Sequence, residues 1–160
     1  MQAINPDFIL PFIESTKNTF EIALQKQVQQ KEVYLKKNDA MFGDVSGTIT
    51  VSGVHNGAVS LSLPGEFAIH CIRDLIGEDS DMPLTQSVFQ DGIGELLNLI
   101  ATGAKTKFEV SQINLDLSEA TVLSGRGHQL PHPEGSSTTS VIFATESGEQ
   151  FALDVSAEAR

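Results

Sequence analysis

The hydrophobic and polar positions near the N-terminus predict an amphipathic helix from about Leu10 to Val28. The positions expected to face the core recur at helical spacing and fall within about 120° of one another at roughly 100° per residue. They are Phe12, Ile13, Thr16, Phe20, Ala23 and Leu24. Pro11 suits the first turn of such a helix, where a missing N–H leaves no bond unmade. A short strand is expected at Val33–Leu35.

Two stretches further along alternate between apolar and polar residues, as expected for half-buried strands. They are Gly47–Gly53 and Ala58–Leu63. The Asn56-Gly57 dipeptide between them readily adopts the positive φ angles of a tight turn. The pattern therefore predicts a β-hairpin.

The rest of the chain predicts two more helices, followed by strands. A helix is expected at Glu66–Ile76, with Gly77 at its C-terminal end, and a long one at about Leu84–Phe108. An acidic loop is expected at 78–81, and a second, Pro- and Ser-rich loop at 131–137. Strands are expected at Ile113–Leu117, Thr121–Gly125, Ser140–Ala144 and Gln150–Val155, the last two joined at Ser147-Gly148. The order predicts one α+β domain over residues 1–160, with the helices packed on one face of a largely antiparallel sheet.

The long helix carries a straight row of polar residues. At about 100° per residue, these residues lie within roughly 80° of one another. They are Asp91, Glu95, Asn98, Thr102 and Lys105. The opposite side is apolar and consists of Phe89, Ile93, Leu96, Leu97, Ile100 and Ala104. An ordinary surface helix has the same division into a buried and a wet side, so the pattern alone permits that interpretation.

Two details favour a functional surface. The helix contains Gly92, Gly94 and Gly103, and each glycine costs about 1 kcal/mol relative to Ala. Gly94 lies beside Glu95, where the lack of a side chain would let another protein approach closely. The row also lacks the long cationic side chains that are usual on a solvated helix, apart from Lys105.

Glu95 and Asn98 point the same way, about one turn apart. An exposed carboxylate can pair with a Lys or Arg of a partner, and a carboxamide both donates and accepts, so it can hold a water in a fixed orientation. The pair suits chemistry in which water must be positioned and the remaining groups are supplied elsewhere. Hydrolysis of a phosphoryl group is such a task.

Composition narrows the choice of partners. The chain has 160 residues, with 10 Lys and Arg against 21 Asp and Glu, which gives a net charge of -11. This acid excess argues against nucleic acid and anionic membranes, which are bound by basic surfaces. No apolar run is long enough for a transmembrane helix, and the N-terminus lacks a secretory pattern. The lone Cys71 cannot form an internal disulfide, which fits the reducing cytoplasm.

The other candidate groups point to ordinary surface or structural roles. No carboxylate–histidine cluster with zinc-like spacing accompanies the histidines, so no metal site is expected. Cys71 has no activating neighbours and is expected to be an inert thiol. The lysines Lys31, Lys36 and Lys37 are expected to form a small solvated patch.

The segment Ile93–Lys105 resembles the signature helix of the CheC/CheX/FliY phosphatases of bacterial chemotaxis. The family pattern is Asp or Ser, three residues, Glu, two residues, Asn, and Asp91, Glu95 and Asn98 match it. Asp44–Gly47, Ile72–Gly77 and Thr121–Arg126 are also similar to CheX segments. CheC-type members carry the motif twice. Here the corresponding positions of the first helix are Leu10, Glu14 and Lys17, and the lysine replaces the asparagine of the motif. Only the copy in the long helix is therefore complete, and a single working motif points to the CheX branch.

The resemblance implies dephosphorylation of the phospho-aspartate of a CheY-type response regulator. Asn98 would orient the attacking water, Glu95 would pair with the regulator's active-site lysine, and Asp91, Gly94 and Thr102 would line the docking surface. The Mg²⁺ would belong to the regulator, so no cofactor is expected in this chain. The resemblance also implies a homodimer joined at sheet edges. Where the family usually has a proline, this chain has Ala120, which leaves open an alternative: a non-catalytic module that docks on a regulator or on the flagellar switch.

Overall fold

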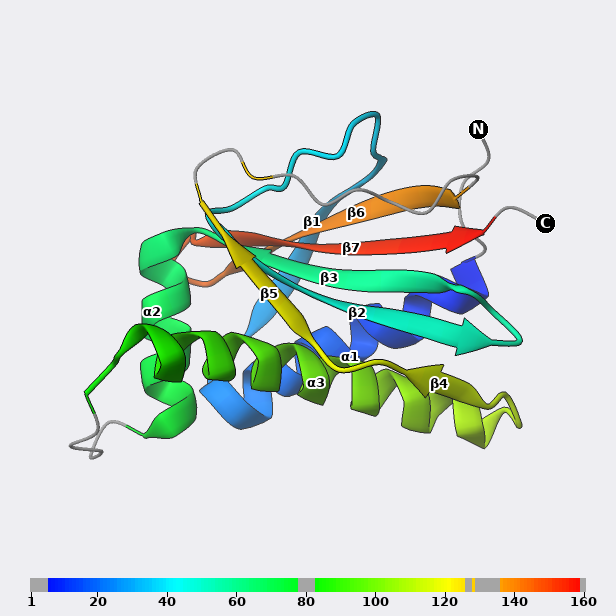
Figure 1. Cartoon of the computed structure of the whole chain (residues 1–160), viewed down its shortest axis with the longest axis horizontal. Coiled ribbons are helices and arrows are strands. Elements are labelled where there is room, and N and C mark those ends of the chain that lie inside the picture. Colours follow the sequence, from blue (N-terminus) through cyan, green and yellow to red (C-terminus); the bar gives the residue numbers. More distant parts are fainter. Residues whose placement is uncertain (1–5, 78–82, 126–127, 129–135, 159–160) are drawn as a thin grey trace.

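The computed structural model describes residues 6–77, 83–125, 128 and 136–158. Within these residues the chain forms three helices and seven strands (Figure 1). The elements are α1 (Pro6–Leu24), β1 (Val28–Leu35), β2 (Val45–Gly53), β3 (Gly57–Leu63), α2 (Gly65–Ile76), α3 (Gln86–Val110), β4 (Leu115–Leu117), β5 (Thr121–Ser124), β6 (Ser136–Thr145) and β7 (Gln150–Glu158).

All strands of the described residues belong to one sheet. Its order is β1-β6-β7-β3-β2-β4, and β5 also pairs with β2. Every pairing is antiparallel. The three helices lie together on one face, with α3 alongside β4 and β5 (Figure 1). The predicted α+β architecture, with helices on one face of an antiparallel sheet, is confirmed.

The core lies between this sheet and the helices, and phenylalanines dominate its centre. Phe151 of β7 stacks on Phe20 of α1 with ring centroids 4.4 Å apart and on Phe143 of β6 at 5.2 Å. Phe67 of α2 reaches the same stack. These rings join α1, α2, β6 and β7 into one apolar cluster, which offset aromatic contacts stabilise beyond simple burial.

The opposite face of the sheet is polar but also buried. Its side chains include Ser46, Ser60, Ser62, Thr138, Ser140, Asp154 and Ser156. The segment between β1 and β2 crosses above this face (Figure 1). Lys36 from that segment donates to Asp154 Oδ2 at 2.8 Å and to the Ala40 carbonyl at 2.8 Å. Lys36 is therefore not part of a solvated basic patch: that prediction is wrong, because the lysine is buried to compensate the charge of Asp154.

The first helix and the first strand differ in their bounds from the prediction, and the differences have local causes. The helix α1 includes Pro6 and ends at Leu24, so Pro11 lies inside it instead of in its first turn. The chain leaves the helix because Gln25 adopts a left-handed φ of 55° and the Lys26 N–H bonds back to the Phe20 carbonyl. Strand β1 then begins at Val28, well before the predicted Val33, and six of its eight side chains are exposed.

The predicted hairpin exists as β2–β3, but Gly57 does not supply the positive φ angle that was expected of it. The positive φ belongs to Gly53 at 121°, whereas Gly57 already pairs with Val51 in the ladder. A Cβ at Gly57 would overlap the Ser156 backbone of β7, so a close approach between strands requires this glycine. The acidic loop 78–81 and positions 131–135 of the second loop lie outside the described residues, and Ser136–Ser137 begin β6.

The predicted ends of the second and third helices are close to those observed, whereas β6 begins at Ser136, four residues before the predicted Ser140. Helix α2 ends at Gly77, which has a φ of 95° and donates to the Arg73 carbonyl, as predicted. Helix α3 begins after Thr85, whose hydroxyl accepts from the Val88 N–H at 3.1 Å. The predicted turn between the last two strands is confirmed: Gly148 has a φ of 94° and its N–H bonds to the Thr145 carbonyl.

Candidate functional site

The helix α3 is held against the fold by one apolar side and by close contacts with both neighbouring helices. Of the predicted inner residues, Phe89 is half-buried, and the others are fully buried: Ile93, Leu96, Leu97, Ile100 and Ala104. A Cβ at Gly92 would come within 2.7 Å of Ile72 of α2, and one at Gly103 would overlap Ser15 of α1. The glycines that suggested an approaching partner are thus explained, at these two positions, by the chain's own helices.

The predicted row of polar residues lies on the outer side of α3. Asp91, Glu95, Asn98 and Thr102 are exposed and Lys105 is half-buried. Among the described residues, no hydrogen bond or ion pair engages the side chains of Glu95 and Asn98. A carboxylate and a carboxamide one turn apart are therefore both available to a second molecule.

The segment leading into β5 borders this row. Gly94 is half-buried, and a Cβ there would lie 3.6 Å from Ala120 and 3.9 Å from Val122. These are ordinary contact distances, so internal packing leaves room for a methyl group at this position. Ala120, which stands where the family usually has a proline, packs directly against the motif helix. The role of Gly94 in docking stays a prediction.

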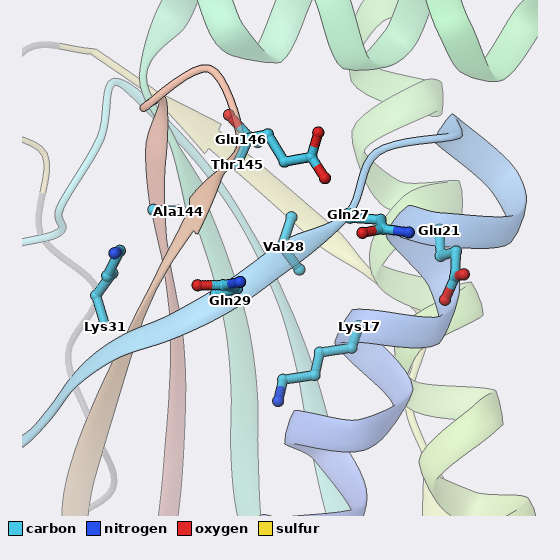
Figure 2. A pocket seen from close by; sticks show the side chains of 9 residues that line it. All are labelled: Lys17, Glu21, Gln27, Val28, Gln29, Lys31, Ala144, Thr145 and Glu146. Atoms are coloured by element: carbon cyan, nitrogen blue, oxygen red, sulfur yellow. The ribbon is translucent and has the colours of Figure 1, made fainter.

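The corresponding slots of α1 are arranged differently. Leu10 is exposed, and Glu14 forms an ion pair with Lys107 of α3 at 3.3 Å between Oε2 and Nζ. Lys17 points into a cleft between α1 and β1 (Figure 2). Glu14 thus has an intramolecular partner, unlike Glu95, and a lysine stands where the motif has its asparagine.

The remaining chemistry-bearing groups of the described residues have structural surroundings. No group of three or more His, Cys, Asp or Glu side chains among them is arranged to hold a metal ion. Burial raises the pKa of the Cys71 thiol to about 12, as expected for an inert cysteine. His128 shares a hydrogen bond of 2.7 Å with the Ser46 hydroxyl, and His55 packs against Phe8.

Sequence reasoning missed two features. One is the buried Lys36–Asp154 pair, and the other is the cleft beside Lys17. Asp154 sits in a strand whose neighbours Leu153 and Val155 face the core, so alternation turns Asp154 to the opposite face but gives no sign that this face is buried. The cleft joins residues far apart in sequence, and local patterns carry no signal for it.

The fold and the motif helix together define a CheC-like protein. The sequence profile described as "Chemotaxis phosphatase CheX" matches residues 45–144, and the chain belongs to this family. Among curated proteins, none matches the chain in sequence. No helix within the described ranges combines the length and apolar character needed to cross a bilayer.

Several solved structures are similar to this chain over nearly its whole length. CheX from Desulfovibrio desulfuricans is 25% identical with a TM-score of 0.84, over 95% of this chain and 99% of that one. A putative chemotaxis protein from Desulfovibrio vulgaris Hildenborough is 28% identical with a TM-score of 0.82, over 95% of this chain and 97% of that one. CheX from Borrelia burgdorferi, solved in complex with CheY, BeF3 and Mg²⁺, shares the fold at 18% identity and a TM-score of 0.79, over 97% and 100%.

Proposed function

We propose that this chain is a hydrolase that removes the phosphoryl group from the phospho-aspartate of a CheY-type response regulator. The observation that carries the proposal is the pair Glu95 and Asn98, exposed one turn apart on α3 without an intramolecular partner among the described residues. Membership of a family described as chemotaxis phosphatases supports hydrolysis as the reaction.

Asn98 would act by positioning water. Its carboxamide oxygen accepts one water hydrogen and its NH₂ group donates, so the water oxygen can be aligned with phosphorus, opposite the bond to the aspartate. The water oxygen forms the new bond to phosphorus, the aspartate carboxylate leaves, and the displaced proton passes to solvent or phosphate. A neutral amide is no base, so the rate enhancement comes from orientation.

Glu95 would dock the partner. Its carboxylate would pair with the regulator's active-site lysine and fix the register in which Asn98 enters. Asp91, Gly94 and Thr102 lie along the same side of α3 and would line the contact. The regulator would contribute its own Mg²⁺, so we propose that this chain binds no cofactor. The complex of Borrelia CheX with CheY supports the choice of a CheY-type partner.

We also propose a cytoplasmic homodimer joined at a sheet edge. Among the described residues, strand β1 pairs with β6 alone, so that its other backbone edge has no strand partner there. The irregularity between Gln30 and Glu32 would divide such a pairing into two short segments. Light scattering at micromolar concentration would show twice the chain mass of 17.2 kDa. A mass of one chain at all concentrations would contradict the dimer.

The phosphatase proposal is tested by the decay of a phosphorylated regulator. A CheY-type receiver is phosphorylated with a small phosphodonor, and its decay is followed with and without this protein in the presence of Mg²⁺. We expect faster decay in proportion to the added protein. Binding without faster decay would instead support the alternative of a non-catalytic docking module, and unchanged decay without binding would overturn both.

A further inference from the structure

The cleft that receives Lys17 lies at the edge of the sheet, away from the polar row of α3. It has a volume of about 510 Å³ and is formed by the second half of α1, the start of β1 and the end of β6 (Figure 2). Buried Val28 and Ala144 are among its lining residues, and the others are polar or charged. This volume lies in the range of pockets that enclose small organic ligands.

Four charged side chains line the cleft, and none of them forms an ion pair with another residue that the structure describes. They are Lys17, Glu21, Lys31 and Glu146. Elsewhere in the described part of the chain, Lys26, Lys36 and Lys107 each pair with a carboxylate. Lys17 and Glu21 are four residues apart on α1, a spacing that permits pairing, yet the structure leaves them apart. Both signs of charge are therefore available to a ligand.

The charges are also sorted in space. In Figure 2 the ammonium groups of Lys17 and Lys31 lie toward one side of the cleft, and the carboxylates of Glu21 and Glu146 lie toward the other. The carboxamides of Gln27 and Gln29 stand among them and can donate as well as accept. A lone anion would meet the two carboxylates, and a lone cation would meet the two ammonium groups. A ligand that carries both charges, some distance apart, satisfies both sides.

We propose that this cleft binds a small zwitterionic peptide, with its carboxylate at Lys17 and Lys31 and its ammonium group at Glu21 and Glu146. The carboxamides of Gln27 and Gln29 match the donor and acceptor of a peptide bond between the two ends. The volume exceeds that needed for one amino acid and accommodates two or three residues. The site is separate from Glu95 and Asn98, and it stands whether or not the chain is a phosphatase.

The cleft uses positions that the motif helix does not. Lys17 occupies the α1 slot that corresponds to Asn98, so a position without the motif's asparagine serves as a binding residue here. The backbone edge of β1 proposed for the dimer and the side chains of Gln29 and Lys31 are different groups, which lets one strand serve both purposes.

The test uses L-alanyl-L-alanine as the probe and the whole protein. Amide chemical shifts in NMR titrations would follow binding, and we expect a Kd of about 1 mM or tighter. Two blocked probes accompany it: the C-terminal amide and the N-acetyl form. Each should bind about fivefold more weakly, which is the scale of one exposed charge pair. An absence of saturable shifts up to about 20 mM would overturn the proposal.

Variants identify which end lies where. Lys17→Gln should weaken binding of the free peptide about fivefold and leave binding of its amide unchanged, because the amide already lacks the charge that Lys17 contacts. Glu146→Gln should also weaken binding of the free peptide about fivefold, and it should leave binding of the N-acetyl form unchanged. Lys37→Gln and Glu109→Gln remove matched exposed charges outside the cleft and should leave Kd unchanged. Equal losses of affinity in the cleft variants and the control variants would contradict the assignment. So would a further loss of affinity when Lys17→Gln is combined with the amide probe or Glu146→Gln with the N-acetyl probe.

Discussion

The Ser15 hydroxyl of α1 donates a hydrogen bond of 2.6 Å to the Ile100 carbonyl of α3, and Gly103 lies against the same hydroxyl. Helix α3 can approach α1 this closely because Gly103 has no side chain. The contact is fully internal, since Ser15 is buried. It fixes the motif helix relative to the core close to Asn98, since Ile100 follows that residue by only two positions.

Gly103→Ala should therefore destabilise the protein despite a better helix propensity. The new methyl group displaces Ser15 at an overpacking cost of about 1–3 kcal/mol, against a propensity gain of about 1 kcal/mol. We expect a net loss of up to about 2 kcal/mol in urea unfolding, partly recovered in Ser15→Ala/Gly103→Ala. Gly94→Ala is the matched control and should be neutral or stabilising, because its methyl group finds ordinary contacts. Equal effects at both glycines would show that the Ser15 contact is unimportant.

Lys36→Met should be among the most destabilising single changes on the polar face of the sheet. It leaves Asp154 buried without its cation, and breaking a buried pair costs about 3–5 kcal/mol. Lys37→Met, at the exposed neighbouring lysine, should change the free energy of unfolding by less than about 0.5 kcal/mol. Lys36→Met/Asp154→Leu should recover most of the loss. If Lys36→Met and Lys37→Met unfold at the same urea concentration, the buried pair does not hold the crossing segment.

Cys71 makes stability depend on pH above about 9. Burial raises the pKa of its thiol from 9.0 to about 12, so between these values the unfolded chain loses a proton that the native protein keeps. The free energy of unfolding then falls by up to about 1.4 kcal/mol per pH unit. The hydrogen bond from Lys26 to Asp74 raises the pKa of that lysine, and its contribution is lost only above 10.5. Measurements from pH 8 to 10 therefore follow the cysteine before the contribution of Lys26 is lost.

Cys71→Ala tests this assignment. The variant loses some packing at every pH, but its stability should lack the decline between pH 9 and 10. The native thiol should also resist disulfide reagents at pH 8 and react on unfolding. A decline of the same slope in the variant would assign the pH dependence to other groups.

Local periodicity could predict the helices and the two hairpins because each buries one continuous side. Strand β1 was mostly missed because it is an edge strand with exposed side chains on both faces, so Val28–Leu35 shows no alternation. The burial of Lys36 depends on Asp154, 118 residues away, and no local pattern reports such a pair. The outward side of α3 was predictable, since helix geometry alone brings Glu95 and Asn98 together.

Glu95→Gln should separate docking from catalysis. It keeps the shape of the side chain and removes the charge proposed to pair with the regulator's lysine. We expect KM for the phosphorylated regulator to rise about tenfold with a smaller change in kcat, and the salt dependence of kcat/KM to weaken. Glu109→Gln, an exposed glutamate at the other end of α3, is the matched control. An unchanged KM and salt dependence in Glu95→Gln would contradict the docking role.

Asn98→Ala should abolish most of the acceleration while leaving the fold and the docking intact. The side chain is exposed and unbonded within the described chain, so its removal should change the free energy of unfolding by less than about 0.5 kcal/mol. If water positioning carries the rate, kcat should fall about 10²-fold with little change in affinity for the phosphorylated regulator. Asn18→Ala removes an exposed asparagine from α1 and is the matched control. This variant should dephosphorylate the regulator at the wild-type rate. A variant at Asn98 that keeps full activity would reject orientation of water by this carboxamide, whatever the result at Glu95.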